Sequence, residues 1–143
     1  MAQSPHTAKL RERRSGGRPL RVLVVDDDRD TVDGLAFILR DEGDVVQCAY
    51  TGKEVLSMVS IFRPDAVILD IVIPHMSGYA LAQAIRHAYT DGGRPLLIAV
   101  SGMWKETPDR KVAQQAGFDE HLVKPYEPAA ILRLLAALRP RDS

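Results

Sequence analysis

Residues 20–28 read LRVLVVDDD, an apolar run of strand length that ends in three consecutive aspartates, Asp26, Asp27 and Asp28. Adjacent carboxylates repel one another and raise one another's pKa, so such a cluster is usually either well solvated or neutralised by a cation. Because the acids follow directly on a predicted buried strand, the stretch indicates a candidate metal site at the strand's carboxyl end.

Similar apolar runs recur along the chain, and segments with helical spacing separate them. The predicted strands are residues 21–25, 45–49, 66–69, 96–100 and 119–123. Five helices are predicted. The first stops at Gly43, the second runs from Thr51 or Gly52 to before Pro64, and the third follows Ser77 and Gly78. The fourth runs from near Pro108 to Gly117, and the fifth follows Pro125 and Pro128. Strands that are almost all Val, Ile and Leu are buried on both faces, and their strict alternation with helices predicts an α/β fold with a parallel sheet wound on both sides.

The composition is that of a soluble globular protein, with 45% apolar and 27% charged residues in a chain of 143. This length suits one domain, which we expect over residues 20–139, followed by a short tail at 140–143. No apolar run approaches the roughly 18 residues that span a bilayer. The single cysteine, Cys48, excludes an internal disulfide and favours a reducing cytoplasm.

The charge is unevenly distributed along the chain. Residues 1–21 carry six basic side chains and one acidic one, whereas the remainder carries 13 basic and 18 acidic residues. Residues 1–19 are predicted to form a disordered basic arm without the apolar core of a secretory signal. We favour a solvated leader over a contact with nucleic acid or membrane.

Polar residues follow four of the five predicted strands. Beyond the triplet of aspartates, Asp70 closes the third strand, Ser101 closes the fourth, and Lys124 follows the fifth. In an open parallel sheet the ligand site lies outside the carboxyl ends of the strands. Several carboxylates, a hydroxyl and an ammonium group are therefore expected to meet at one edge.

These groups have a chemistry in common. Carboxylate oxygens from two strands suit a hard divalent cation such as Mg²⁺. A carboxylate can also accept a phosphoryl group covalently, and a neighbouring lysine and hydroxyl can contact the phosphoryl oxygens. Asp70 is the natural acceptor because it stands alone at the end of the central strand, while Asp26 and Asp27 are placed to hold the metal.

Four segments, residues 22–28, 68–78, 99–102 and 116–125, resemble the receiver domain of two-component response regulators in order and spacing. The resemblance covers residues 20 to about 139. It implies a flavodoxin-like (βα)5 fold with five parallel strands in the order 2-1-3-4-5. It also implies that the bond between Lys124 and Pro125 is often cis.

The resemblance also assigns roles to individual residues. Asp70 would be the phosphoacceptor, and the metal ligands would be Asp26, Asp27, Asp70 and the backbone carbonyl of Val72. Ser101 would be the switch hydroxyl, with Lys124 as its cationic partner. The metal would be Mg²⁺, with Mn²⁺ as an alternative.

His121 departs from the family pattern, because many receivers carry Tyr or Phe three residues before the lysine. A histidine keeps a planar ring but can gain charge near neutral pH. We weigh a switching role against a partly exposed histidine on the last strand. Asp28 is expected to cap the first helix or to face solvent, the alternative being direct metal contact.

Three functions compete. The first is a switch: a sensor histidine kinase or a histidine phosphotransfer domain phosphorylates Asp70, and the face of the fourth helix, fifth strand and fifth helix changes its affinity for a downstream protein. The second is a phosphohydrolase, which would need a second acid where Val72 stands. The third is an interaction module that is never phosphorylated, and the joint presence of the acids, Ser101 and Lys124 speaks against it.

On the first interpretation the protein is not an enzyme beyond catalysing its own phosphorylation and dephosphorylation. It would act in the cytoplasm as a monomer or weak dimer, without a nucleic-acid-binding domain or a membrane segment. The sequence leaves the kinase, the stimulus and the output open, and does not distinguish a free-standing receiver from part of a longer protein.

Overall fold

The computed structural model describes residues 19–73, 76–89, 93–102 and 110–138. Its centre is a parallel sheet of five strands, in the spatial order β2-β1-β3-β6-β7. The strands are β1 (Arg21–Val25), β2 (Val45–Ala49), β3 (Ala66–Asp70), β6 (Leu96–Ser101) and β7 (Glu120–Val123). Numbered along the chain within this sheet, the order is 2-1-3-4-5, and the predicted flavodoxin-like fold is confirmed.

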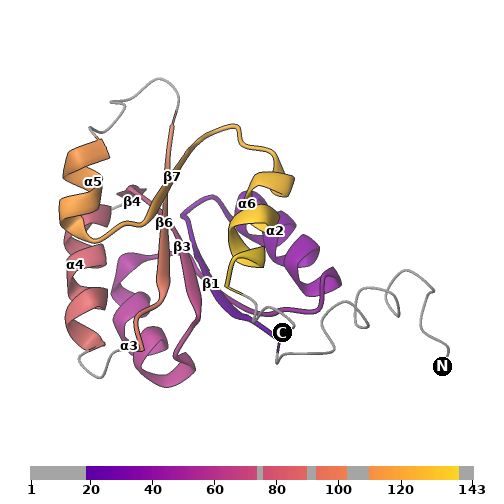
Figure 1. The fold of residues 1–143 in the computed structure, drawn as a ribbon, viewed down its shortest axis with the longest axis horizontal. Coiled ribbons are helices and arrows are strands. Elements are labelled where there is room, and N and C mark those ends of the chain that lie inside the picture. Colours follow the sequence, from indigo (N-terminus) through magenta and orange to yellow (C-terminus); the bar gives the residue numbers. More distant parts are fainter. Residues whose placement is uncertain (1–18, 74–75, 90–92, 103–109, 139–143) are drawn as a thin grey trace, which may run out of the picture.

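Helices cover both faces of the sheet, as Figure 1 shows. They are α2 (Arg29–Asp41), α3 (Gly52–Phe62), α4 (Gly78–Ala88), α5 (Arg110–Ala116) and α6 (Pro128–Ala136). One buried cluster joins the sheet to α2 and α6, and a second joins it to α3, α4 and α5. The sheet is therefore the middle layer of three.

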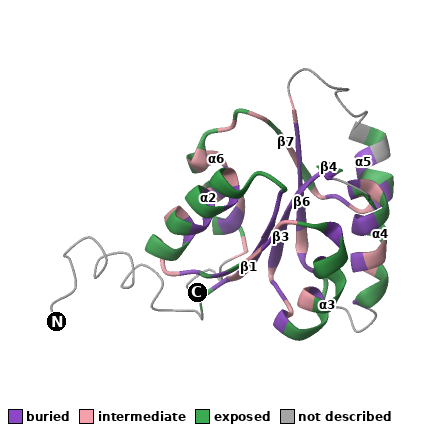
Figure 2. Cartoon of the chain, turned by 180° about the vertical axis from the view of Figure 1, so that it is seen from behind, coloured by how far each residue is buried: buried purple, intermediate pink, exposed green. Residues whose placement is uncertain are grey.

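The central strands are buried because both their faces pack on helices, whereas the edge strands β2 and β7 are more exposed. All five residues of β3 are buried, and four of the five in β1 are. Figure 2 shows these two strands as the buried centre of the molecule. A fully buried strand needs apolar residues at every position, which is why these strands lack an alternating pattern.

The helix ends follow the predicted capping residues. Asp28 is the N-cap of α2, where its side chain accepts a hydrogen bond from the Asp30 N–H at 3.2 Å and another from the Thr31 hydroxyl at 2.8 Å. The expected capping role of Asp28 is confirmed. Gly43 follows α2 with φ at 94°, a backbone angle that favours glycine. The last helix begins at Pro128 itself rather than after it, because proline fits the first turn of a helix.

A short antiparallel hairpin was not predicted. It pairs β4 (Val72–Ile73) with β5 (Met76–Ser77) directly after the central strand. Gly78 closes it, donating its N–H to the Ile71 carbonyl at 3.0 Å. A Cβ at Gly78 would lie 2.6 Å from the Ile71 Cα, so only glycine fits there. Strands of two residues are too short to show a hydrophobic period, which is why the sequence pattern missed them.

Several predictions concern residues outside the described ranges. The basic arm, apart from Pro19, and the tail at 140–143 are among them, and the fourth predicted helix is described only from Arg110. None of the described helices has the length and apolar character to cross a membrane.

Candidate functional site

The carboxyl ends of β1 and β3 bring three aspartates together. Asp26 follows β1 directly and Asp70 is the last residue of β3, which pairs with β1. One carboxylate oxygen from each of Asp26, Asp27 and Asp70 lies within 4.8 Å of the others. Asp26 and Asp70 are buried, whereas Asp27 is exposed. The structure thus assembles the acidic cluster that the strand ends predicted.

Lys124 reaches this cluster from the loop after β7. Its Nζ donates to Asp26 Oδ2 at 2.6 Å and to Asp70 Oδ2 at 3.1 Å. Burial favours the neutral amine, but the hydrogen bonds and charges of the two carboxylates outweigh burial and raise the pKa of Lys124. The lysine therefore stays charged and bridges the two buried acids.

Asp70 is held in one orientation by both of its oxygens. Oδ1 accepts the Val72 N–H at 3.0 Å, while Oδ2 faces Lys124. Burial raises the pKa of Asp70 and the neighbouring charge of Asp26 adds to this, although the Val72 hydrogen bond and Lys124 act in the opposite direction. The site thus holds a buried carboxylate at an energetic cost.

Three carboxylates against one ammonium leave the site with excess negative charge. Carboxylates that a fold gathers in spite of their repulsion fit a hard cation such as Mg²⁺, which takes one or two of them and keeps several waters. Asp26, Asp27 and Asp70 are the residues that could hold it. The Val72 backbone lies beside Asp70, and its carbonyl stays a predicted ligand.

Ser101 lies at the end of β6, next to Asp70 on the neighbouring strand, where Asp70 pairs with Val100. Its side chain is buried, and its Oγ lies 2.8 Å from Nε2 of His121 on β7. The sequence indicated both residues as switch candidates but did not predict that they are bonded to each other. The bond depends on strand register: His121 pairs with Ala99, two residues before Ser101 and on the same face.

The bond between Lys124 and Pro125 is cis, as predicted. An apolar groove of about 600 Å³ lies beside this loop and runs along α2. The residues that line it are Asp30, Thr31, Gly34, Leu35, Ile38, Lys124, Pro125, Tyr126 and Pro128. The sequence did not predict the groove, because its two walls are about 90 residues apart in the chain.

Comparison with known proteins is consistent with this geometry. The family model described as the response regulator receiver domain matches residues 22–136. An uncharacterized 14.6 kDa protein of Leptolyngbya boryana is 38% identical over 114 residues, which are 80% of this chain and 86% of that protein. The DNA-binding response regulator MtrA of Mycobacterium tuberculosis is 32% identical over 123 residues, 85% of this chain and 52% of MtrA. The chain thus spans about half the length of MtrA.

Solved structures show the same fold. A CheY-like response regulator receiver domain protein from Methanospirillum hungatei has a TM-score of 0.75 and 27% identity, covering 84% of this chain and 93% of that one. The chemotaxis response regulator CheY4 of Vibrio cholerae has a TM-score of 0.73 and 25% identity, covering 85% and 99%.

Proposed function

Since this chain belongs to the family of response regulator receiver domains of two-component systems, we propose that Asp70 accepts a phosphoryl group from a phosphohistidine of a partner protein. The main support for the proposal comes from the contacts of the Asp70 carboxylate. The carboxylate is buried, is oriented by the Val72 N–H, and is bridged by Lys124 to a second buried acid. A carboxylate fixed in this way is poised to act as a nucleophile.

In the proposed transfer, an Asp70 carboxylate oxygen forms a bond to phosphorus while the bond between phosphorus and the histidine nitrogen breaks. The electron pair of the broken bond stays on the imidazole of the donor, and the product is an aspartyl phosphate. Lys124 stays within reach of the new phosphoryl oxygens, and the Ser101 hydroxyl can donate a hydrogen bond to one of them.

Asp26, Asp27 and Asp70 would hold Mg²⁺, or Mn²⁺ in its place, and the Val72 carbonyl would complete the protein ligands. A bound divalent cation offsets the negative charge that gathers on the phosphoryl oxygens during transfer. Without it, three carboxylates would repel the incoming phosphoryl group.

The donor would be a sensor histidine kinase or a histidine phosphotransfer domain. The groove between α2 and the loop after β7 offers it an apolar surface next to the site, because Lys124 both lines the groove and contacts Asp70. A donor helix seated there would bring its phosphohistidine to the acceptor.

We further propose that the protein is not a phosphohydrolase and catalyses only its own phosphorylation and dephosphorylation. The position two residues beyond the acceptor, where such enzymes usually carry a second acid, is Val72, an apolar residue that is 58% exposed. Its downstream target would be a protein. A cytoplasmic location accords with the single cysteine, since the chain has no second cysteine with which to form a disulfide.

The test is incubation with acetyl phosphate and Mg²⁺, followed by intact mass measurement. We expect the wild type to gain the mass of one phosphoryl group and Asp70→Asn to gain none. Asp33→Asn is the matched control, because Asp33 is an exposed aspartate on α2. If the wild type gains no mass, or if the gain survives in Asp70→Asn, the proposal is wrong.

A further inference from the structure

We propose that His121 is a positioning residue that holds the Ser101 hydroxyl toward β7 before phosphorylation. A phosphoryl group on Asp70 then has to compete with His121 for this hydroxyl. The inference rests on the proposed function, since it concerns the hydroxyl that would contact the phosphoryl group. It adds a restraint on that hydroxyl which comes from this chain's own histidine.

The geometry of the pair is well defined. Ser101 and Ala99 lie on the same face of β6, and Ala99 pairs with His121 across the strands. The imidazole therefore reaches diagonally to Ser101, with 2.8 Å between Nε2 and Oγ. Ser101 is only 3% exposed, so in the unphosphorylated chain its hydroxyl has little access to water as a replacement partner.

Within the described part of the chain, the hydrogen bond to His121 is the one that the structure shows for the Ser101 hydroxyl. Asp70 makes its hydrogen bonds elsewhere, with the Val72 N–H and Lys124. The hydroxyl that the proposed function aims at the phosphoryl group is thus directed at β7 instead. We take the imidazole proton to lie on Nδ1, so that the Ser101 hydroxyl donates its one proton to Nε2.

A hydroxyl has one proton, and a buried hydroxyl that gives up a partner needs another. Capture of a phosphoryl group supplies that second partner, but the bond to His121 must first break or bend. The histidine therefore lowers the affinity of the site for a phosphoryl group relative to a ring that forms no bond. Phenylalanine is such a ring, and glutamine can place an amide group where Nε2 lies.

The probe is beryllofluoride, a noncovalent stand-in for a phosphoryl group, titrated into protein saturated with Mg²⁺ and followed by calorimetry. We expect His121→Phe to bind it about threefold to tenfold more tightly than the wild type, which is the range expected for one lost hydrogen bond. His121→Gln should stay within about twofold of the wild type, because its amide restores the bond.

Repeating the titrations in a Ser101→Ala background separates the hydrogen bond from ring packing. There, His121→Phe should change the affinity by less than about twofold, since the bond is already absent. Equal or weaker binding by His121→Phe, equal tightening by the Gln variant, or tightening that persists without the Ser101 hydroxyl would each overturn the inference.

Nuclear magnetic resonance of the wild type gives a test that needs no variant. The ¹⁵N signal of His121 Nε2 should shift when Mg²⁺ and beryllofluoride are added together, because its partner turns away. An unchanged signal in a protein that binds the probe would contradict the inference. Failure of the wild type to bind the probe at all would instead count against the proposed function.

Discussion

At the amino end of the sheet Asp119 lies between Arg86 and Arg94, whereas at the carboxyl end Asp26 and Asp70 share Lys124. The amino-end cluster therefore has more cations than acids, and its carboxylate is fully paired. The carboxyl-end cluster has more acids than cations. Both clusters tie elements together that are far apart in sequence, but only the second leaves negative charge uncompensated.

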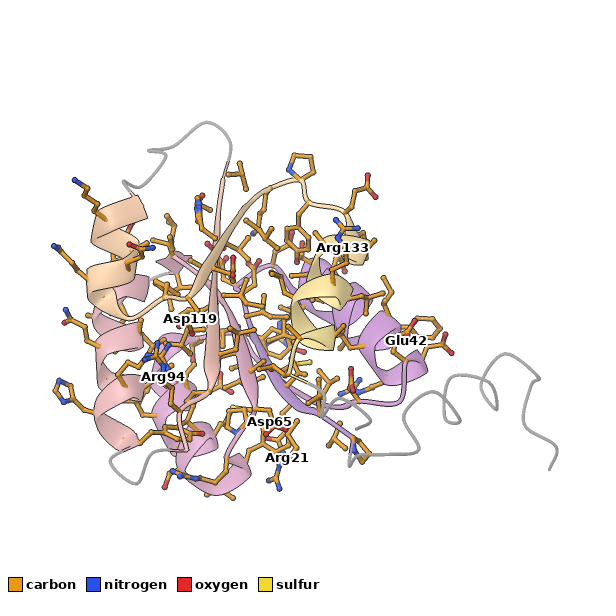
Figure 3. The ribbon with its side chains drawn as sticks, in the orientation of Figure 1. Arg21, Glu42, Asp65, Arg94, Asp119 and Arg133 are labelled. Atoms are coloured by element: carbon orange, nitrogen blue, oxygen red, sulfur yellow. The ribbon has the colours of Figure 1, made fainter. Side chains whose placement is uncertain are left out.

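The amino-end cluster satisfies backbone groups as well as charges. Arg86 donates to the Gly117 carbonyl at 2.9 Å and to the Pro95 carbonyl at 2.7 Å, and Asp119 accepts the Leu97 N–H at 2.9 Å. Figure 3 shows Arg94 and Asp119 lying together beside the sheet. The cluster joins α4 to the starts of β6 and β7. It is an arrangement that stabilises the fold.

The pKa values of the two aspartates move in opposite directions. Burial opposes ionisation of Asp119, but the hydrogen bonds from Leu97 and the two arginines outweigh burial and lower its pKa. Burial raises the pKa of Asp70. The fold thus gains stability from the amino-end cluster and loses some at the carboxyl-end cluster, as expected where a site has to bind a ligand.

The largest effect should come from Asp119→Asn. We expect it to lower the free energy of unfolding by about 2 kcal/mol at neutral pH, because the partly buried Asp119 side chain loses its charge and keeps one acceptor oxygen in place of two. Urea unfolding measures the change. Arg94→Gln is the control, because Arg94 is 61% exposed and its ion pair should be worth less than about 0.5 kcal/mol.

The effect of Asp119→Asn should also depend on pH. A carboxyl whose pKa is lowered by folding contributes stability above its unfolded pKa of about 4 and loses that contribution as the pH falls through the folded value. The difference in free energy of unfolding between the wild type and Asp119→Asn should therefore become smaller on acidification. A difference that is constant from neutral pH to about pH 3 would show that Asp119 acts by its shape and not its charge.

The second effect concerns the cation that the acidic cluster could hold. Mg²⁺ at about ten times its dissociation constant should stabilise the wild type by about 1.4 kcal/mol, since it binds the folded state alone. Asp27→Asn should abolish most of this gain and leave stability without Mg²⁺ unchanged, because Asp27 is exposed and belongs to the acidic group. Thermal unfolding with and without Mg²⁺ measures both. Equal stabilisation of the two proteins would remove Asp27 from the metal ligands.

The smallest effect should come from Asp70→Asn, and its sign is opposite to that at Asp119. Without Mg²⁺ we expect this variant to be more stable than the wild type by about 1 kcal/mol at neutral pH, because a buried charge beside Asp26 is removed. A carboxyl whose pKa is raised by folding destabilises the fold at high pH, and this penalty disappears below its unfolded pKa of about 4.

The higher stability of Asp70→Asn relative to the wild type should therefore disappear on acidification. Urea unfolding at neutral and at acidic pH measures this change. Asp33→Asn serves as the control, since the exposed Asp33 should change stability by less than about 0.5 kcal/mol. Destabilisation by Asp70→Asn would mean that the link to Lys124 outweighs the repulsion by Asp26.

Sequence patterns were most informative where the signal is local. The apolar runs gave the five sheet strands, and acids or polar groups at the ends of four of them indicated the site, because side chains that follow neighbouring parallel strands must meet at one edge. The pairing of Ser101 with His121 lay beyond such patterns. It depends on which residue of β7 faces Ala99, and that register is set by packing.

The cluster around Arg86 shows the same limit. Nothing near Arg86 in the sequence indicates that its guanidinium binds the carbonyls of Pro95 and Gly117, which lie in two different loops. A Cβ at Gly117 would lie 2.8 Å from the Arg86 Cγ, and the φ of this glycine is 110°. The glycine was predicted as a helix stop, but its close approach to Arg86 is visible only in the packed structure.

Hydrophobic spacing and motif spacing are properties of the chain alone, so the fold class, the kinds of side chain at the carboxyl edge and, through family resemblance, the strand order could be predicted from the sequence. The way in which those groups are shared became visible in the folded structure: Lys124 between Asp26 and Asp70, Ser101 with His121, and Asp119 between two arginines. These partnerships depend on distances of a few ångströms between residues that lie 20 to 98 positions apart, and such distances are fixed by packing.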